Sequence, residues 1–301
     1  YYVIACLAPS SSLVRTEDSQ SLSTGSNPVG AIYFLTFSNK VEIRGFFLPC
    51  SFYNNLPMIN ELAHRPWPRP RTPCIMTQQW HDLLFMHWPI PASILEPLIP
   101  KNLMIDHFGG SAWIGIVPFR MSNIRLKGLP AMPGISAFPE LNVRTYVTDG
   151  VKPGVWFFSL DATNLLAVAI ARAWYHLPYF YAEMSIKKLE NKFSYKSQRK
   201  TFKAIRPEFS LEYGPTGDSF LAQKGSIDYW LTERYCLYAA RPNDLYRGEI
   251  DHAPWQLQRA CAKILTNTLA DFLPTPLPNI EPLLHFSRFQ EVVLWNLQKV
   301  T

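Results

Sequence analysis

The sequence contains none of the short motifs that mark several common enzyme classes. It has no G-x-G-x-x-G, no G-x-x-x-x-G-K, no H-E-x-x-H and no G-x-S-x-G pattern. These patterns build the phosphate-binding turns of Rossmann domains and P-loop NTPases, the zinc site of many metalloproteases and the nucleophile turn of α/β-hydrolases. Their absence argues against all four classes.

Long apolar runs and paired cysteines are missing as well. The best candidate for a membrane span, residues 165–171, ends at Arg172 and falls short of the ~18 residues that a span needs. The first nine residues carry no basic segment of the kind that opens a secretory signal. The five cysteines are odd in number and form no C-x-x-C pair, which indicates free thiols in a reducing compartment. The sequence therefore predicts a cytoplasmic protein.

Proline, by contrast, is abundant, with 26 residues in 301. Because proline interrupts helices and central strands, many short elements joined by fixed turns are expected. A hydrophobic fraction of 48% and an aromatic fraction of 14% supply a core for one large domain or two small ones. The net charge of +6 favours weak contact with anions but indicates no fold.

Residues 1–57 differ in texture from the rest, since they are polar and follow no period of a helix or strand. Within them, the codons of Gly25-Ser26-Asn27-Pro28 can read as the T-arm of a transfer-RNA gene. We hypothesise that this segment is translated non-coding DNA ahead of a start at Met58 or Met76. A naturally disordered extension is the alternative.

Residues 58–75 form a lead-in rich in proline and arginine, including Arg65-Pro66-Trp67-Pro68-Arg69-Pro70-Arg71, which we expect to be solvated. Residues 76–301 are expected to form one domain, mainly antiparallel β with a few helices. Strands are predicted at 77–88, 103–106, 111–118, 138–147, 155–160, 179–184, 235–239, 245–252, 283–289 and 291–297. Helices are predicted at 92–98, at 164–175 with a cap at Asp161 or Thr163, at 226–234 with a cap at Ser226, and at 257–269.

The strand at 138–147 is the most informative stretch. Successive side chains of a strand point to opposite faces. One face therefore carries Glu140, Asn142, Arg144 and Tyr146, and the other is apolar. A carboxylate and a guanidinium on one face, flanked by an amide and a phenol, make a candidate binding row.

This row has two interpretations. If it lines an enclosed interior, Arg144 can hold a carboxylate and Glu140 can act as acid or base. If it faces water, it is a surface ladder that contributes little to stability. Neighbouring strands that are apolar on both faces favour the enclosed interpretation. The residues that could complete the pocket are His176, Tyr179, Arg234, Tyr235 and His252.

Two other features have structural explanations. His81 and His87 could share a face, but a metal site needs a third ligand, so core or capping histidines are expected and no metal. Residues 185–206 are rich in lysine and arginine and alternate with aromatics, which predicts a hairpin turning at Glu190-Asn191 with a solvated basic face. Nucleic-acid binding by that hairpin is disfavoured because its aromatics fit the core face of the same strands.

Several separate motifs occur in the order seen in one family. They are Trp80-His81-Asp82-Leu83-Leu84-Phe85, His87-Trp88-Pro89, Glu140-Leu141-Asn142-Val143-Arg144-Thr145-Tyr146, Phe158-Ser159-Leu160-Asp161, Leu177-Pro178-Tyr179, Glu233-Arg234-Tyr235 and His252-Ala253-Pro254-Trp255. With these motifs, residues 64–299 resemble the YqjF-type family of uncharacterised bacterial proteins. That family resembles acetoacetate decarboxylase in fold, which implies an antiparallel β-barrel or cone with helices around it.

The resemblance also bears on chemistry. The decarboxylases carry a motif with a Schiff-base lysine, and the similar stretch here is His176-Leu177-Pro178-Tyr179-Phe180-Tyr181-Ala182. The lysine and its neighbour fall on Tyr179 and Phe180, and the motif glutamate corresponds to Glu140. Without a lysine amine there is no nucleophile for an imine with a β-keto acid. The resemblance therefore implies the scaffold and a small-molecule cavity without the decarboxylase chemistry.

From the sequence we expect a cavity that binds or transforms a small organic acid or carbonyl compound. Arg144 and Glu140 would be the catalytic pair, and Asn142, Tyr146, His176, Tyr179, Arg234 and His252 would contact the ligand. Whether the protein is an enzyme is left open; lyase- or isomerase-like acid–base chemistry is expected of one, with no cofactor. Neither nucleic acid nor a membrane is an expected partner, and a homo-oligomer is left open. The alternative is a non-enzymatic interaction protein with a basic hairpin face.

Overall fold

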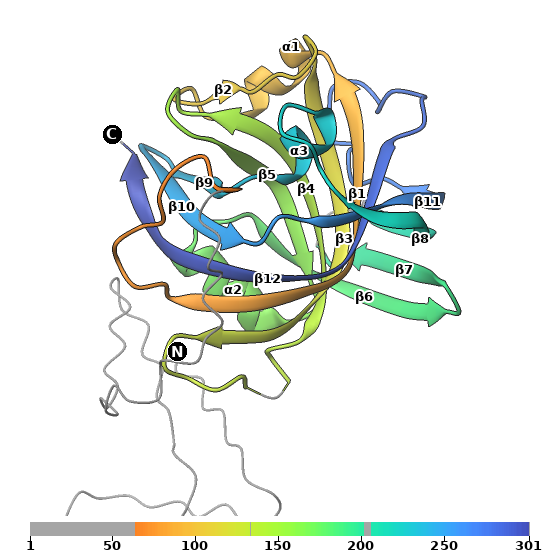
Figure 1. The fold of residues 1–301 in the computed structure, drawn as a ribbon, viewed down its shortest axis with the longest axis horizontal. Helices are drawn as coiled ribbons and strands as arrows, with labels where there is room; N and C mark the ends of the chain where they lie inside the picture. The colour runs from red at the N-terminus through yellow and green to blue at the C-terminus, as the bar shows by residue number, and fades with distance from the viewer. Residues whose placement is uncertain (1–63, 133, 202–205, 301) are drawn as a thin grey trace, which may run out of the picture. The chain divides into compact units, whose positions relative to one another are not determined.

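The computed structural model describes residues 64–132, 134–201 and 206–300 (Figure 1). By its contacts the chain divides into two units, Tyr1–Met58 and Ile59–Thr301, and every described residue belongs to the second. The predictions for residues 1–57 and for Met58 lie outside the described residues.

The described residues form a twelve-stranded sheet. Its strands are β1 (Met76–Ile90), β2 (Met104–Ile105), β3 (Ala112–Leu126), β4 (Phe138–Thr148), β5 (Pro153–Ala162), β6 (Tyr179–Leu189), β7 (Lys192–Arg199), β8 (Glu208–Leu221), β9 (Cys236–Arg241), β10 (Asp244–His252), β11 (Gln256–Asn267) and β12 (Leu283–Val300).

The sheet closes on itself. Strands β1, β3, β4, β5, β9, β10 and β12 each pair with their neighbours in a continuous cycle, which we call the closed ring. Strands β6, β7, β8 and β11 form a second arc that leaves the ring at β5 and returns to it at β12 (Figure 1). Among these pairings only β5–β6 and β5–β9 are parallel. The predicted mainly antiparallel β fold is confirmed, and the closure takes the form of a ring of strands.

Few helices accompany this sheet. They are α1 (Ala92–Leu95), the 3-10 turn η3 (Glu96–Leu98), α2 (Leu165–Trp174) and α3 (Ile227–Thr232). The predicted cap of α3 is confirmed, since the Ser226 side chain accepts the Tyr229 N–H. The predicted cap of α2 is wrong: Asn164, not Asp161 or Thr163, accepts the Ala167 N–H.

One predicted helix is a strand. Residues 257–269 were expected to be helical because alanine, leucine and lysine favour helices. The structure places β11 there, paired antiparallel with β8 from Gln256↔Leu221 to Asn267↔Phe209. Pairing along a neighbouring strand outweighs weak local propensity. The two strands predicted at 283–289 and 291–297 are one continuous strand, β12.

The lead-in segment is not a solvated arm, contrary to expectation. The Arg65 side chain is buried, and its guanidinium donates to the Ile250 carbonyl at 2.6 Å and to Asp251 Oδ1 at 2.7 Å. The Trp67 indole N–H donates to Glu249 Oε2 at 2.7 Å. Two buried carboxylates of β10, Glu249 and Asp251, need partners, and the lead-in supplies some of them beside Lys152, which fixes it against the sheet.

The basic hairpin has the predicted turn. β6 and β7 pair antiparallel up to Leu189↔Lys192, and Glu190 adopts the left-handed backbone conformation of a tight turn. Phe193 and Tyr195 point into the core. These two aromatics are therefore buried, while the lysines of β6 and β7 remain exposed.

Three cysteines of the described residues, Cys74, Cys236 and Cys261, are free thiols. No helix in the described part of the chain has the length and apolar character needed to cross a membrane.

Candidate functional site

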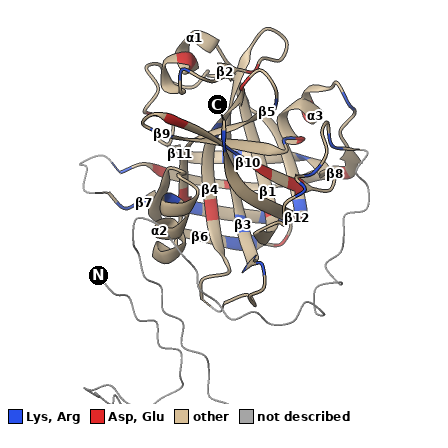
Figure 2. Cartoon of the chain, turned by 90° about the vertical axis from the view of Figure 1, so that its left-hand side faces the viewer, with Lys and Arg blue, Asp and Glu red and all other residues tan. Residues whose placement is uncertain are grey.

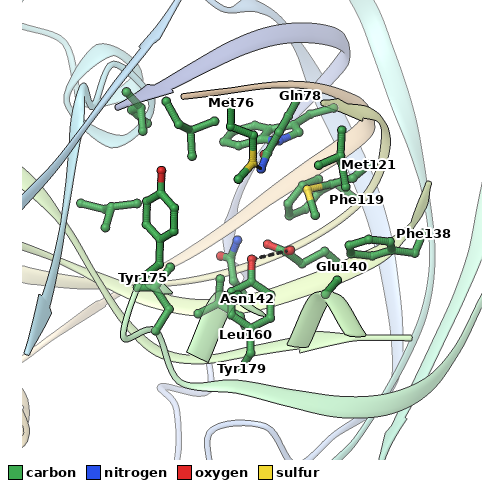
Figure 3. Close-up of a pocket in the computed structure, with 18 of the residues that line it drawn as sticks. Met76, Gln78, Phe119, Met121, Phe138, Glu140, Asn142, Leu160, Tyr175 and Tyr179 are labelled. Atoms are coloured by element: carbon green, nitrogen blue, oxygen red, sulfur yellow. Dashed lines mark hydrogen bonds between the residues drawn. The ribbon is translucent and has the colours of Figure 1, made fainter. Parts of the chain in front are cut away.

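A cavity of about 210 Å³ lies inside the closed ring, and every strand of that ring contributes a side chain to its wall. Helix α2 and the loop between β3 and β4 supply further wall residues. Figure 3 shows Glu140, Asn142 and Tyr179 directed into it, with Phe119, Met121 and Phe138 close by. The alternation of β4 explains this arrangement, because Leu141, Val143 and Val147 pack into the core on its opposite face.

Six of the eight predicted site residues line this cavity. They are Glu140, Asn142, Arg144, Tyr179, Arg234 and His252. Tyr146 and His176 do not line it, and no lysine is among the described residues that do.

Glu140 is buried, with 3% of its surface exposed. Burial raises its pKa from 4.5 to about 8; the hydrogen bond from Tyr179 partly opposes this rise, and the nearby Asp161 carboxyl adds to it. The Tyr179 hydroxyl donates to Glu140 Oε2 at 2.8 Å, and burial raises the pKa of this phenol well above its ordinary value. At neutral pH the cavity therefore presents a neutral carboxylic acid held by a neutral phenol.

The second carboxyl near Glu140 has its own partner. Asp161 lies on β5 opposite Leu141, on the face turned away from the cavity. Burial raises its pKa to about 6, although Arg199 opposes that rise with a 2.9 Å hydrogen bond from Nε to Asp161 Oδ1. Glu140 lacks any such cationic partner among the described residues, which leaves it as the protonated member of the pair.

Arg144 brings a positive charge to the same cavity. Its guanidinium is partly buried and forms no ion pair with any carboxylate in the described part of the chain. Nη2 makes only long contacts, 3.3 Å to the Tyr146 hydroxyl and 3.5 Å to the Leu231 carbonyl, and Nε is buried without a partner. The Phe85 ring lies 5.2 Å away. A positive charge in such surroundings is a ready site for an anion.

Tyr146 and His87 lie behind Arg144 and support it. The Tyr146 hydroxyl donates to the Leu231 carbonyl at 2.9 Å and lies 2.6 Å from His87 Nε2. Burial, followed by the charge of Arg144, holds the pKa of His87 well below its ordinary value. Gly115 leaves room for this ring, since a Cβ there would lie 2.9 Å from His87 Cδ2. Tyr146, which was predicted to contact the ligand, is thus fully buried and does not line the cavity.

His81 and His87 do not form a site together. His81 Nε2 lies 2.7 Å from the Ser122 hydroxyl, in a half-exposed position. Across residues 64–132, 134–201 and 206–300, no three His, Cys, Asp or Glu side chains gather as metal ligands would.

Arg234 and His252 have internal partners. Arg234 Nη1 donates to Asp106 Oδ2 at 2.6 Å, and Nε donates to the Trp230 carbonyl at 2.7 Å. The His252 ring stacks on Tyr235 at 4.6 Å, and its two nitrogens lie close to backbone carbonyls. Burial lowers the pKa of His252. These two residues shape one wall of the cavity, and Arg234 needs no ligand to balance its charge.

His176 lies outside the cavity. It follows α2 directly and adopts a left-handed backbone conformation with φ of 53°, as residues that end a helix often do. Its ring packs on Tyr246, 5.2 Å away. The position after the helix therefore sets where this side chain points, and the predicted ligand contact His176 does not line the cavity.

Several wall residues were not predicted, among them Gln78, Trp80, Tyr175 and Thr232. Trp80 and Tyr175 stood in predicted elements, but nothing in their local pattern told which face turned inward. The ring pairs strands that lie far apart in the sequence, such as β1 and β12, and that closure places these residues in one wall.

The fold is that of the acetoacetate decarboxylase class. The chain is similar to the enduracididine biosynthesis enzyme MppR complexed with pyruvate, with a TM-score of 0.55 and 11% identity, over 76% of this chain and 91% of that one. It is also similar to acetoacetate decarboxylase from Legionella pneumophila, with a TM-score of 0.53 and 13% identity, over 79% of this chain and 94% of that one. At these identities the likeness concerns the fold alone.

The sequence comparisons are more specific. Residues 77–291 match the model of DUF2071, a family described as an uncharacterised conserved protein, and the chain belongs to this family. The uncharacterised protein YqjF of Bacillus subtilis is 49% identical over 225 residues, which cover 75% of this chain and 92% of YqjF. The resemblance seen in the sequence motifs is confirmed.

Proposed function

We propose that the cavity binds a small organic acid or carbonyl compound, with Arg144 as the carboxylate anchor and Glu140 as the proton donor. The observation that carries this proposal is a guanidinium without a carboxylate partner in the same cavity as a neutral carboxylic acid. Any chemistry there is acid–base chemistry of a lyase or isomerase kind, without a Schiff base.

Arg144 suits a carboxylate because a guanidinium offers two parallel N–H donors to its two oxygens. A partly buried cation with weak internal contacts gains more from such a ligand than a cation that is already paired. Arg234 is the paired cation of this cavity, since Asp106 already accepts from it. Of the two, Arg144 is therefore the anchor.

Glu140 complements this anchor because it is neutral. An ionised carboxylate in the cavity would repel an anionic ligand, whereas a protonated one can donate to a carbonyl or hydroxyl oxygen. Tyr179 holds the acid in place through its 2.8 Å hydrogen bond. The affinity for a carboxylate should therefore fall as the pH rises through about 8, where Glu140 ionises.

Two comparisons support the class of ligand and limit the chemistry. MppR was solved with pyruvate, which combines a carboxylate with a carbonyl group. Tyr179 occupies the place that the resemblance gives to the Schiff-base lysine, and its phenol bonds to Glu140. No described lining residue offers an amine for an imine, so proton transfer is the chemistry that these side chains support.

The test is thermal unfolding in the presence of small carboxylates and their neutral amides. A carboxylate at about a hundred times its dissociation constant adds ~2.7 kcal/mol to the free energy of unfolding. Arg144→Met should abolish the shift and the amides should give none. Arg288→Met is the matched control, because Arg288 is 54% exposed and pairs with Asp82 outside the cavity. An undiminished shift in Arg144→Met would refute the anchor.

A second candidate is an interaction protein that uses the basic hairpin. The observation behind it is a set of exposed lysines on β6 and β7, whose basic segments are visible in Figure 2. Those lysines are Lys187, Lys188, Lys192 and Lys196. Replacing all four with glutamate should abolish retention on an immobilised polyanion if this candidate holds, and should leave the carboxylate-induced thermal shift unchanged.

A further inference from the structure

The two polar ends of the cavity are far apart. Glu140 and Arg144 stand four residues apart on β4, so their Cα atoms are separated by ~13 Å at the ordinary rise of a strand. The Arg144 guanidinium contacts Tyr146 and Leu231, so it extends along β4 away from Glu140. A compact acid such as pyruvate cannot reach both ends.

Apart from Asn142 and Tyr179, the wall near Glu140 is largely apolar. Phe119, Met121 and Phe138 lie beside its carboxyl (Figure 3). The loop between β3 and β4 adds Leu129 to the wall. None of these four side chains carries a hydrogen-bonding nitrogen or oxygen, so they favour a hydrocarbon over a polar ligand.

Helix α2 continues this apolar wall. Its side chains at Leu166, Ala167, Ile170 and Ala171 face the cavity, while Ala169 on the opposite side of the helix is exposed. Ala167 and Ala171 are small, so α2 leaves space that a larger side chain would occupy. This side of the cavity can accept an apolar group, whereas a polar group buried there would lack a hydrogen-bond partner.

From this geometry we propose that the ligand is an extended monocarboxylic acid with an apolar body of the size of a medium-chain fatty acid, which carries a carbonyl or hydroxyl oxygen where it reaches Glu140. The carboxylate binds Arg144, and the body runs past Asn142 towards Glu140 and α2. This inference rests on the proposed function and specifies its ligand. The cavity volume of about 210 Å³ limits the length of the body.

The expected energetics follow from burial of the chain. Each buried methylene contributes ~0.8 kcal/mol, which tightens binding about fourfold. Affinity should therefore rise about fourfold per carbon from butyrate to octanoate and should stop rising once the chain outgrows the cavity.

Titration calorimetry with butyrate, hexanoate, octanoate, dodecanoate, pyruvate and octan-1-ol tests the proposal. Octanoate should bind at least a hundredfold more tightly than butyrate or pyruvate, and octan-1-ol should bind at least tenfold more weakly than octanoate. Ala167→Phe, which fills the apolar wall at α2, should weaken octanoate at least tenfold and leave butyrate unchanged. Ala169→Phe is the matched control on the exposed side of α2 and should change neither.

Each contrary outcome has a distinct meaning. If butyrate and pyruvate bind as tightly as octanoate and all three depend on Arg144, the apolar body is wrong and the proposed function stands. If octan-1-ol matches octanoate, the carboxylate is not what the site recognises, and this proposal is overturned. If none of the acids binds, the proposed function itself fails.

Discussion

Replacing Glu140 with glutamine tests the electrostatics of the cavity directly. Glutamine has nearly the same shape and keeps an oxygen that can accept from Tyr179, but it cannot ionise. The variant therefore removes the titration of one buried group and leaves the packing around it in place.

The expected magnitude follows from the pKa of Glu140, which is about 8 in the folded protein against 4.5 when the group is fully hydrated. Because the folded-state pKa is the higher one, the stability that Glu140 contributes is fully present below pH 4.5 and is lost as the pH rises through about 8. A difference of about 3.5 pKa units corresponds to ~5 kcal/mol, at ~1.4 kcal/mol per unit. Glu140→Gln should be spared this loss.

The assay is urea unfolding of both proteins at half-unit intervals between pH 4 and 9. The difference in unfolding free energy, variant minus wild type, should grow by ~5 kcal/mol from the lowest to the highest pH. Its slope should be ~1.4 kcal/mol per pH unit between the unfolded-state and folded-state pKa values of Glu140. The titration of Asp161 occurs in both proteins and largely cancels. Glu183→Gln, which removes a carboxylate that is 64% exposed on β6, should give a nearly constant difference. A flat difference for Glu140→Gln would show that this carboxyl ionises normally and that the neutral-acid reasoning is wrong.

Two further variants test the support of the site and the lead-in segment. Tyr179→Phe removes a hydrogen bond that lowers the pKa of Glu140, so this pKa should be higher in the variant. In the same urea series, the variant should therefore go on losing stability up to a higher pH than the wild type. Arg65→Ala removes a buried cation that pairs with both Glu249 and Asp251, while Lys152 and Arg69 still pair with them. The variant should therefore destabilise the fold by roughly 1.5–3 kcal/mol in urea unfolding. Arg71→Ala, on the exposed side of the lead-in, should change stability by no more than about 0.5 kcal/mol. Equal effects of the two arginines would show that Arg65 does not fix the lead-in against the sheet.

The polar row on β4 was predictable because it depends only on the two-residue period of a strand. Glu140, Asn142 and Arg144 enter the cavity for that reason, and the apolar face enters the core. The period could not tell that Tyr146, on the same face, sits behind the wall. Its hydroxyl forms hydrogen bonds with His87 and with the Leu231 carbonyl, which come from distant parts of the chain.

The elements that sequence reasoning mistook are those whose state depends on distant partners. β11 has the composition of a helix, and only its long pairing with β8 makes it a strand. Arg65 looked solvated because its partners, Glu249 and Asp251, lie far along the chain on β10. The apolar side of the cavity was missed for the same reason, since α2 and β1 contribute to it only after the ring has closed.

A crystal structure of the protein grown with saturating octanoate would show where the acid binds. Its carboxylate oxygens should lie at hydrogen-bonding distance, ~2.9 Å, from the Arg144 guanidinium, with the chain running along β4 towards Glu140 and α2. Octanoate bound elsewhere, or bound in the cavity with its carboxylate away from Arg144, would contradict this binding mode.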